Sequence, residues 1–202
     1  MPQAPPPPQQ RPKSAFRHYA EAIVVAVILA LGIRTFVVEA FTIPSGSMLS
    51  TLRIGDYLLV NKFIYYFTEP RRGDIIVFEF PLDPQRDFIK RIVGLPGETI
   101  EIKNKQISIN GQPAREEYVS FSSDTVQPGR LSNRDNFGPL TLPAGTYFML
   151  GDNRDDSLDS RFWGPLSNDA VVGKAFLIYW SWDAEARGLA KVRWRRLGKL
   201  LR

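Results

Sequence analysis

The stretch Ile100-Glu101-Ile102-Lys103-Asn104-Lys105-Gln106-Ile107-Ser108-Ile109 contains two short runs in which isoleucine alternates with a polar residue. Successive side chains of a strand point to opposite faces, so each run would place its isoleucines on one face. The residues from Lys103 to Gln106 form the expected turn region, and Asn110-Gly111 is typical of a second turn. The stretch therefore predicts a β-hairpin and favours a β-rich domain around it.

Runs of the same kind recur along the body of the chain, where β-branched and aromatic residues stand between turn formers. Residues 112–140 interrupt the pattern, because they are polar and rich in turn formers and show no periodicity; we expect a small inserted cap there. The predicted fold class is mostly β, with an antiparallel β-sheet domain over residues 41–183. Its further expected strands are residues 57–60, 74–80, 88–93, 146–150 and 171–180.

The N-terminal region divides into a polar arm and an apolar segment. Residues 1–18 include six prolines within the first twelve positions, so we expect a disordered arm. Residues 19–40 hold the one long apolar run, which just reaches the ~17 residues that a membrane-spanning helix needs. We expect a transmembrane anchor with a cytoplasmic N-terminus. Two alternatives stay open for this segment, a cleavable signal peptide and a buried core helix.

Charge is distributed unevenly along the 202 residues, whose formal net charge is +5. Residues 19–183 carry 16 bases and 20 acids, whereas residues 184–202 carry seven bases and one acid. We expect this basic tail to be an amphipathic helix, either solvated or lying on a membrane surface. Basic charge alone would also suit nucleic acid. The absence of cysteine excludes disulfides, thiol catalysis and thiolate metal sites.

Two serines flank one glycine in Ile43-Pro44-Ser45-Gly46-Ser47-Met48, just after the apolar run. A serine nucleophile needs a neighbouring base. The one histidine, His18, lies on the other side of the apolar run, so the base of a reactive serine here would have to be lysine. The plain alternative is an ordinary turn, which Pro-Ser-Gly-Ser also suits.

Lys90 has suitable surroundings for a base, because strand alternation places it on one face with Phe88 and Ile92. A free lysine has a pKa of ~10.4 and is protonated at neutral pH, whereas a lysine base needs a pKa of ~7 to 8. Desolvation by apolar neighbours lowers the pKa in that direction. The alternative is an edge-strand lysine whose amine reaches water.

The stretch from Gly151 to Arg161 is dense in side chains that hydrogen-bond and pair. A calcium loop starting at Asp155 is rejected, since Ser160 stands in place of the required glycine and Leu166 in place of the required glutamate. We expect no metal site. An ion pair of Asp159 with Arg161 in a structural turn is expected whatever the function.

Together these elements resemble the type I signal peptidases, membrane-anchored serine proteases that remove signal peptides from exported proteins. The resemblance also covers Arg72-Gly73-Asp74-Ile75-Ile76-Val77-Phe78 and Lys90-Arg91-Ile92-Val93-Gly94-Leu95-Pro96-Gly97, and so most of the body. It implies that Ser47 is the nucleophile, that Lys90 is the general base, and that the Ser45 hydroxyl and the Ser47 N–H form the oxyanion hole. It also implies supporting residues around the lysine and its loop, which are Ser157, Asp159, Arg161 and Asp152.

The resemblance further implies cleavage of preproteins after Ala-x-Ala, without a cofactor and without a nucleic-acid partner. The substrate would lie extended as an added strand beside the site. The chain would have one span in the bacterial inner (cytoplasmic) membrane, contact its lipids, and hold its catalytic domain on the outer face. Shallow apolar pockets for small substrate residues would be lined by Phe41, Ile43, Leu52, Phe88 and Ile89.

The chain departs from the family pattern at Ser50, where a proline is usual. Two other functions stay open at this point. One is a specialised processing peptidase of the same fold, acting on pilin-like or conjugation substrates. The other is a non-enzymatic envelope protein that binds peptides, which would be indifferent to replacement of Ser47 by alanine.

Overall fold

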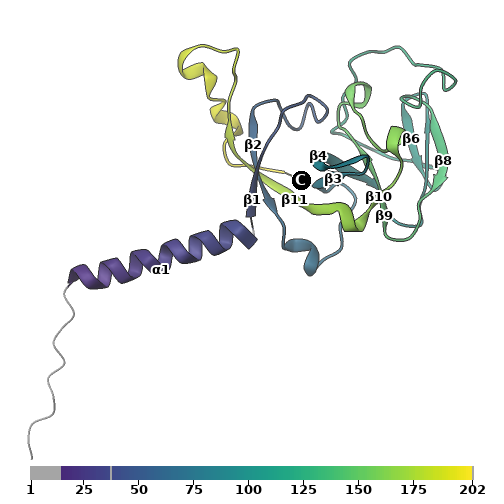
Figure 1. Cartoon of the computed structure of the whole chain (residues 1–202). Coiled ribbons are helices and arrows are strands. Elements are labelled where there is room, and N and C mark those ends of the chain that lie inside the picture. The colour runs from purple at the N-terminus through teal and green to yellow at the C-terminus, as the bar shows by residue number, and fades with distance from the viewer. Residues whose placement is uncertain (1–14, 37, 202) are drawn as a thin grey trace, which may run out of the picture. The chain divides into compact units, whose positions relative to one another are not determined.

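The computed structural model describes residues 15–36 and 38–201, which belong to two compact units, Met1–Val37 and Val38–Arg202. The described part of the first unit is helix α1 (Ala15–Phe36) (Figure 1). Within the described ranges we find no helix whose length and hydropathy together would carry it across a bilayer. Residues 1–14 of the predicted arm lie outside the described residues. Residues 15–18 are helical, because the good helix formers that follow extend the helix to Ala15.

The predicted anchor was wrong over residues 38–40, which are part of a strand. Strand β1 (Val38–Thr42) pairs with strand β2 (Asp56–Asn61), with Val38 opposite Asn61 and Thr42 opposite Tyr57. Backbone hydrogen bonds to β2 therefore hold these residues extended as the edge of a sheet. The chain passes from β1 straight into the serine stretch.

A large sheet forms most of the second unit (Figure 1). Its strand order is β1-β2-β11-β3-β4-β9-β10, with β12 added to β11, and all its strand pairs are antiparallel. The predicted strands at residues 57–60, 74–80, 88–93, 146–150 and 171–180 are confirmed within it, whereas β1, β10 and β12 were not predicted. The further strands of this sheet are β3 (Ile75–Phe80), β4 (Asp83–Gly94), β9 (Thr146–Leu150), β10 (Leu166–Ser167), β11 (Val171–Ser181) and β12 (Lys199–Leu200).

A second sheet of four strands contains the predicted hairpin. Strands β5 (Thr99–Lys103) and β6 (Gln106–Ile109) pair as expected, and Asn104 and Lys105 have the positive φ angles that such a two-residue turn requires. The cap prediction was wrong at both ends of residues 112–140, because β7 (Gln112–Pro113) and β8 (Phe137–Thr141) extend this sheet to the order β7-β6-β5-β8. The residues between them form turns and irregular backbone.

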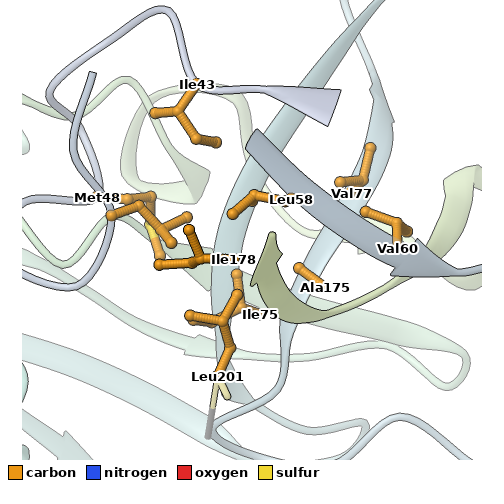
Figure 2. Close-up of a cluster of buried hydrophobic side chains, with 10 residues drawn as sticks. Ile43, Met48, Leu58, Val60, Ile75, Val77, Ala175, Ile178 and Leu201 are labelled. Carbon is orange, nitrogen blue, oxygen red and sulfur yellow. The ribbon is translucent and has the colours of Figure 1, made fainter. Parts of the chain in front are cut away.

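Three clusters of buried apolar side chains hold the second unit together. The first cluster joins the serine stretch to the large sheet, since Ile43, Met48 and Leu52 pack with residues of β2, β3 and β11. Figure 2 shows Met48, Ile178 and Leu201 as members of this cluster. Burial of such side chains contributes about 1.5–3 kcal/mol each. The serine stretch is therefore anchored on the core at several points.

The basic tail is not the amphipathic helix that we expected. Its described residues form two short 3-10 helices, η4 (Gly188–Lys191) and η5 (Trp194–Arg196), before β12 returns to β11. Gly188 and Gly198 have positive φ angles that end regular helix, and Leu201 is buried in the first cluster. The other short helices are η1 (Ile64–Tyr66), η2 (Arg154–Asp156), α2 (Ser160–Trp163) and η3 (Asn168–Ala170).

Candidate active site

Ser47 lies in residues 43–52, which begin where β1 ends and which we call the nucleophile loop after the role predicted for Ser47. Two backbone hydrogen bonds fix its start, from Ile43 N to Asp56 O at 2.9 Å and from Gly55 N to Ile43 O at 3.0 Å. Met48 and Leu52 are completely buried, so the loop is held on the side away from its hydroxyls. Ser47 itself is 7% exposed. Its side chain therefore has a fixed and largely desolvated position.

Lys90 reaches Ser47 from the neighbouring strand β4. Its Nζ donates hydrogen bonds to Ser47 Oγ at 2.7 Å and to the Ile89 carbonyl at 3.1 Å. Lys90 is 4% exposed, and its Nζ lies 5.3 Å from the centre of the Phe88 ring. Strand alternation had placed these two side chains on one face. The structure thus brings together the two residues predicted as nucleophile and base.

Burial lowers the pKa of the Lys90 amine from 10.5 to about 8, against an opposing effect of the Asp159 and Asp152 carboxylates. An amine with this pKa is neutral in a useful fraction of molecules near neutral pH. At 2.7 Å from Ser47 Oγ, a neutral amine is within reach of the hydroxyl proton. The pair can therefore convert a serine hydroxyl into a nucleophile.

Ser45 and Ser157 lie near the pair without a strong contact to it. Ser45 Oγ is 3.4 Å from Ser47 Oγ, and the Ser45 side chain is exposed. Ser157 is 7% exposed, and its Oγ has no hydrogen-bond partner within the described part of the chain. The structure therefore contains no hydrogen bond from Ser157 to the lysine amine. The oxyanion role of Ser45 and the positioning role of Ser157 stay predictions.

Asp159 and Arg161 form the buried ion pair expected of them. Arg161 donates to both carboxylate oxygens at 2.8 Å, and the Asp159 carboxylate also accepts from Gly151 N at 3.1 Å. Arg161 further donates to the Arg154 carbonyl at 2.7 Å. These bonds connect both ends of residues 151–161, which we call the 151–161 loop. The pair acts as an internal brace of that loop.

Asp152 is paired with a residue outside its own loop. It does not join Asp159 and Arg161; instead Arg91 donates to its two carboxylate oxygens at 2.8 and 2.7 Å. Thr51 donates to the same carboxylate at 2.5 Å. Strand pairing of β4 with β9 brings Arg91 to Asp152, although the two residues lie far apart in sequence. Asp152 thus connects the 151–161 loop to both the nucleophile loop and β4.

Sequence reasoning missed Asn153, which links the same loops. Its side-chain nitrogen donates to the Gly46 carbonyl and its backbone N–H donates to the Ser47 carbonyl, both at 3.1 Å. In the sequence, the only indication of such a role for Asn153 was its position inside a polar stretch. Gly151 is equally constrained, since an added Cβ would lie 2.5 Å from the Ser47 carbonyl oxygen and 2.2 Å from Ser157 Oγ.

The five residues predicted to line the substrate pockets divide by burial. Ile43 and Leu52 are core residues, whereas Phe41 and Ile89 pack partly buried against the same cluster. Phe88 packs against a different cluster, with Phe78 and Ile92. Their role in substrate binding stays a prediction. Among the described residues, no group of three or more histidine or carboxylate side chains is placed to hold a metal.

A serine hydroxyl against a lysine amine of lowered pKa, on an antiparallel β domain, is the arrangement of a serine hydrolase with a lysine base. Residues 16–180 match the family described as signal peptidase, peptidase S26, and the chain belongs to this family. It is 42% identical to signal peptidase I of Leptolyngbya laminosa, over 89% of each chain. It is 36% identical to signal peptidase I of Pseudomonas aeruginosa, over 81% of this chain and 72% of that one.

A solved structure of a signal peptidase I from Enterococcus faecalis is 35% identical, with a TM-score of 0.43, and covers 53% of this chain and 97% of that one. The family and its curated members make this chain a signal peptidase, a hydrolase.

Proposed function

We propose that the chain removes N-terminal signal peptides from exported preproteins by a Ser47–Lys90 dyad, with Ser47 as nucleophile and Lys90 as general base. The observation that carries this proposal is the 2.7 Å separation of Lys90 Nζ and Ser47 Oγ in a desolvated site. The neutral amine takes the hydroxyl proton as Oγ attacks the scissile carbonyl, and the protonated amine then returns a proton to the leaving amine. Water completes the reaction by hydrolysing the acyl-enzyme.

The substrate is proposed to bind as an extended segment along β4 and to be cut after Ala-x-Ala. Strand β9 pairs with β4 only from Arg91 to Gly94. Among the described strands, that leaves the same edge of β4 unpaired just before Arg91, next to the lysine. A peptide added there gains backbone hydrogen bonds, and the apolar side chains around the site would select small residues. Ser45 is proposed to help bind the oxyanion.

The chain is further proposed to be anchored in the bacterial inner membrane through its N-terminal segment, with the second unit on the outer face. The support is the apolar run from Ala22 to Ile33 and the basic residues that precede it. Anchoring would keep the active site close to the lipid surface from which signal peptides emerge. Membrane lipids are then its second kind of partner.

Replacing Ser47 or Lys90 by alanine tests the dyad. We expect each variant to lose cleavage of a purified preprotein by about a thousandfold or more, because serine and base act as one unit. Matched controls are Ser108→Ala, in the small sheet, and Lys103→Ala, whose side chain is 74% exposed. The readout is the mass of the products after incubation with the full chain in detergent. Cleavage that persists in either test variant would refute the dyad.

A further inference from the structure

Residues 116–123 form neither a strand nor a helix, and we call them the strap. They lie within residues 112–140, where we expected a small inserted cap. In the structure the backbone of the strap forms one isolated bridge, between Ser120 and Asn153. The contacts of Ser120 and Tyr118 give this segment its significance, because they reach strand β4, the nucleophile loop and the 151–161 loop.

Ser120 joins the nucleophile loop to the 151–161 loop. Its Oγ donates to the Leu49 carbonyl at 2.7 Å, two residues beyond Ser47. Its backbone N–H donates to the Asp152 carbonyl at 2.8 Å, and its own carbonyl accepts from Arg154 N at 3.0 Å. Ser120 therefore adds a third link, beside Asp152 and Asn153, between two loops that are about a hundred positions apart in sequence.

Tyr118 joins the strap to strand β4. Its ring centre lies 3.9 Å from the guanidinium carbon of Arg91, the residue that follows Lys90 and is almost completely buried. A desolvated cation over an aromatic ring is attracted to the ring more strongly than an exposed one. The Tyr118 hydroxyl donates to Glu116 at 2.8 Å, and Glu116 in turn pairs with Arg154 at 2.7 Å. Burial raises the pKa of this hydroxyl, so it remains a donor.

The dyad depends on these distant contacts because its two members come from separate segments. The hydrogen bond between Lys90 and Ser47 joins β4 to the nucleophile loop, and both are braced by the 151–161 loop. A displacement of about 1 Å between reacting groups can lower a rate by about a hundredfold. The strap contacts all three, through Ser120 and Tyr118.

We propose that the strap sets the distance between Ser47 and Lys90, and that Tyr118 and Ser120 are its positioning residues. This inference rests on the proposed Ser47–Lys90 chemistry. Neither residue contacts the reacting atoms, so their effect is exerted through Arg91, Leu49 and the 151–161 loop. The rate of the bound complex, and not the affinity for substrate, should depend on them.

The test measures kcat and KM for preprotein cleavage by full-length variants in detergent. We expect Ser120→Ala and Tyr118→Ala to lower kcat by about tenfold or more with KM within about twofold, since positioning is lost while substrate contacts stay. Tyr118→Phe keeps the ring over Arg91 and should retain kcat to within about threefold. The control is Glu117→Gln in the same segment, whose side chain is 81% exposed.

Several results would overturn the proposal that the strap positions the dyad. They are kcat within about twofold of the parent in both Ser120→Ala and Tyr118→Ala, a change confined to KM, or an equal loss in Tyr118→Phe and Tyr118→Ala. Thermal unfolding identifies a variant that fails to fold; if Tyr118→Ala does so, Ser120→Ala decides. Ser47→Ala and Lys90→Ala separate the two proposals. If Ser47→Ala or Lys90→Ala still cleaves the preprotein, the dyad is refuted. If both are inactive while Ser120→Ala and Tyr118→Ala keep normal kcat, only the proposal about the strap is refuted.

Discussion

The buried amine of Lys90 lowers the stability of the folded protein. Its pKa falls from 10.5 to about 8 because the amine is buried. A shift of this size corresponds to about 3 kcal/mol of free energy against the protonated form. The Asp159 and Asp152 carboxylates favour the protonated amine, but they only partly offset the effect of burial on its pKa. The protein therefore tolerates a destabilising charge at the position where the proposed mechanism uses a neutral amine.

Replacing Lys90 by methionine should make the protein more stable at pH 7 and inactive. Below pH 8 both folded and unfolded states hold the proton, so the native state carries the full penalty. Between about pH 8 and about pH 10.5 only the unfolded state stays protonated, so the free energy of unfolding of the parent rises with pH. The excess stability of Lys90→Met should thus shrink by about 3 kcal/mol over this window. Urea unfolding at both ends of the window measures it.

An excess that stays constant across this pH range would contradict the lowered pKa. Other titrating groups are common to both proteins, so they cancel in the difference.

Residue-level prediction succeeded where local pattern was sufficient. Alternation along one strand placed Lys90 among apolar neighbours, and the spacing of two residues suited the pair of Asp159 with Arg161. It gave no sign that Arg91 would be the partner of Asp152, because strand pairing brings the two residues together. It also gave no sign of Tyr118 or Ser120, because a contact between irregular segments leaves no periodic trace in the sequence.

The C-terminal segment from Arg193 to Leu201 supports the nucleophile loop at the scale of elements. Arg196 donates to the Asp56 carboxylate, at 3.0 Å through Nε, and to the Thr51 carbonyl at 2.9 Å. Ser181 also donates to Asp56 at 2.6 Å. Although burial opposes it, these hydrogen bonds keep the pKa of the Asp56 carboxyl below its ordinary value. The segment thus fastens the end of the loop that carries Ser47.

Arg196→Ala should destabilise the second unit by about 3–5 kcal/mol, because it leaves the fully buried Asp56 carboxylate without its cation. The neighbouring Arg195→Ala is the matched control, since Arg195 is exposed and should cost less than about 0.5 kcal/mol. Denaturant unfolding of both variants at neutral pH makes the comparison. Equal stability of the two variants would show that the ion pair does not hold the segment in place.

Elements with a regular pattern were predictable from the sequence, and elements defined by distant pairing were not. The hairpin of β5 and β6 was predicted because alternation and turn residues are both local. The tail was wrongly drawn as a helix because its leucines fit a helical period, whereas Leu201 is in fact drawn into the core cluster that contains Met48. Strands of two residues, such as β10 and β12, are too short to show a period.

At the scale of the whole molecule, the second unit contains the entire candidate site and all three apolar clusters. A chain of residues 38–202 should therefore fold and cleave a soluble precursor peptide with kcat/KM within about threefold of the full chain. It should lose the full chain's co-sedimentation with lipid vesicles. Failure of the full chain to co-sediment would contradict the anchor, and an inactive shortened chain would contradict the independence of the second unit.

The fold class was predictable, but the arrangement of the strands was not. Strand β11 lies between β2 and β3, although about a hundred residues separate it from either in sequence. No local pattern encodes such a neighbour, because any apolar strand satisfies the same alternation. The same long-range pairing brings residues 47, 90 and 151–161 together. The site could thus be proposed from its motifs, and its geometry required the structure.

The central claim is that Lys90 acts as a neutral base toward Ser47, and the pH dependence of kcat/KM tests it most directly. Because the amine must be deprotonated to work, preprotein cleavage should rise with pH through a single ionisation at about 8 and then level off. A profile that is flat from about pH 6 to about pH 10, or one that falls across this range, would contradict the account.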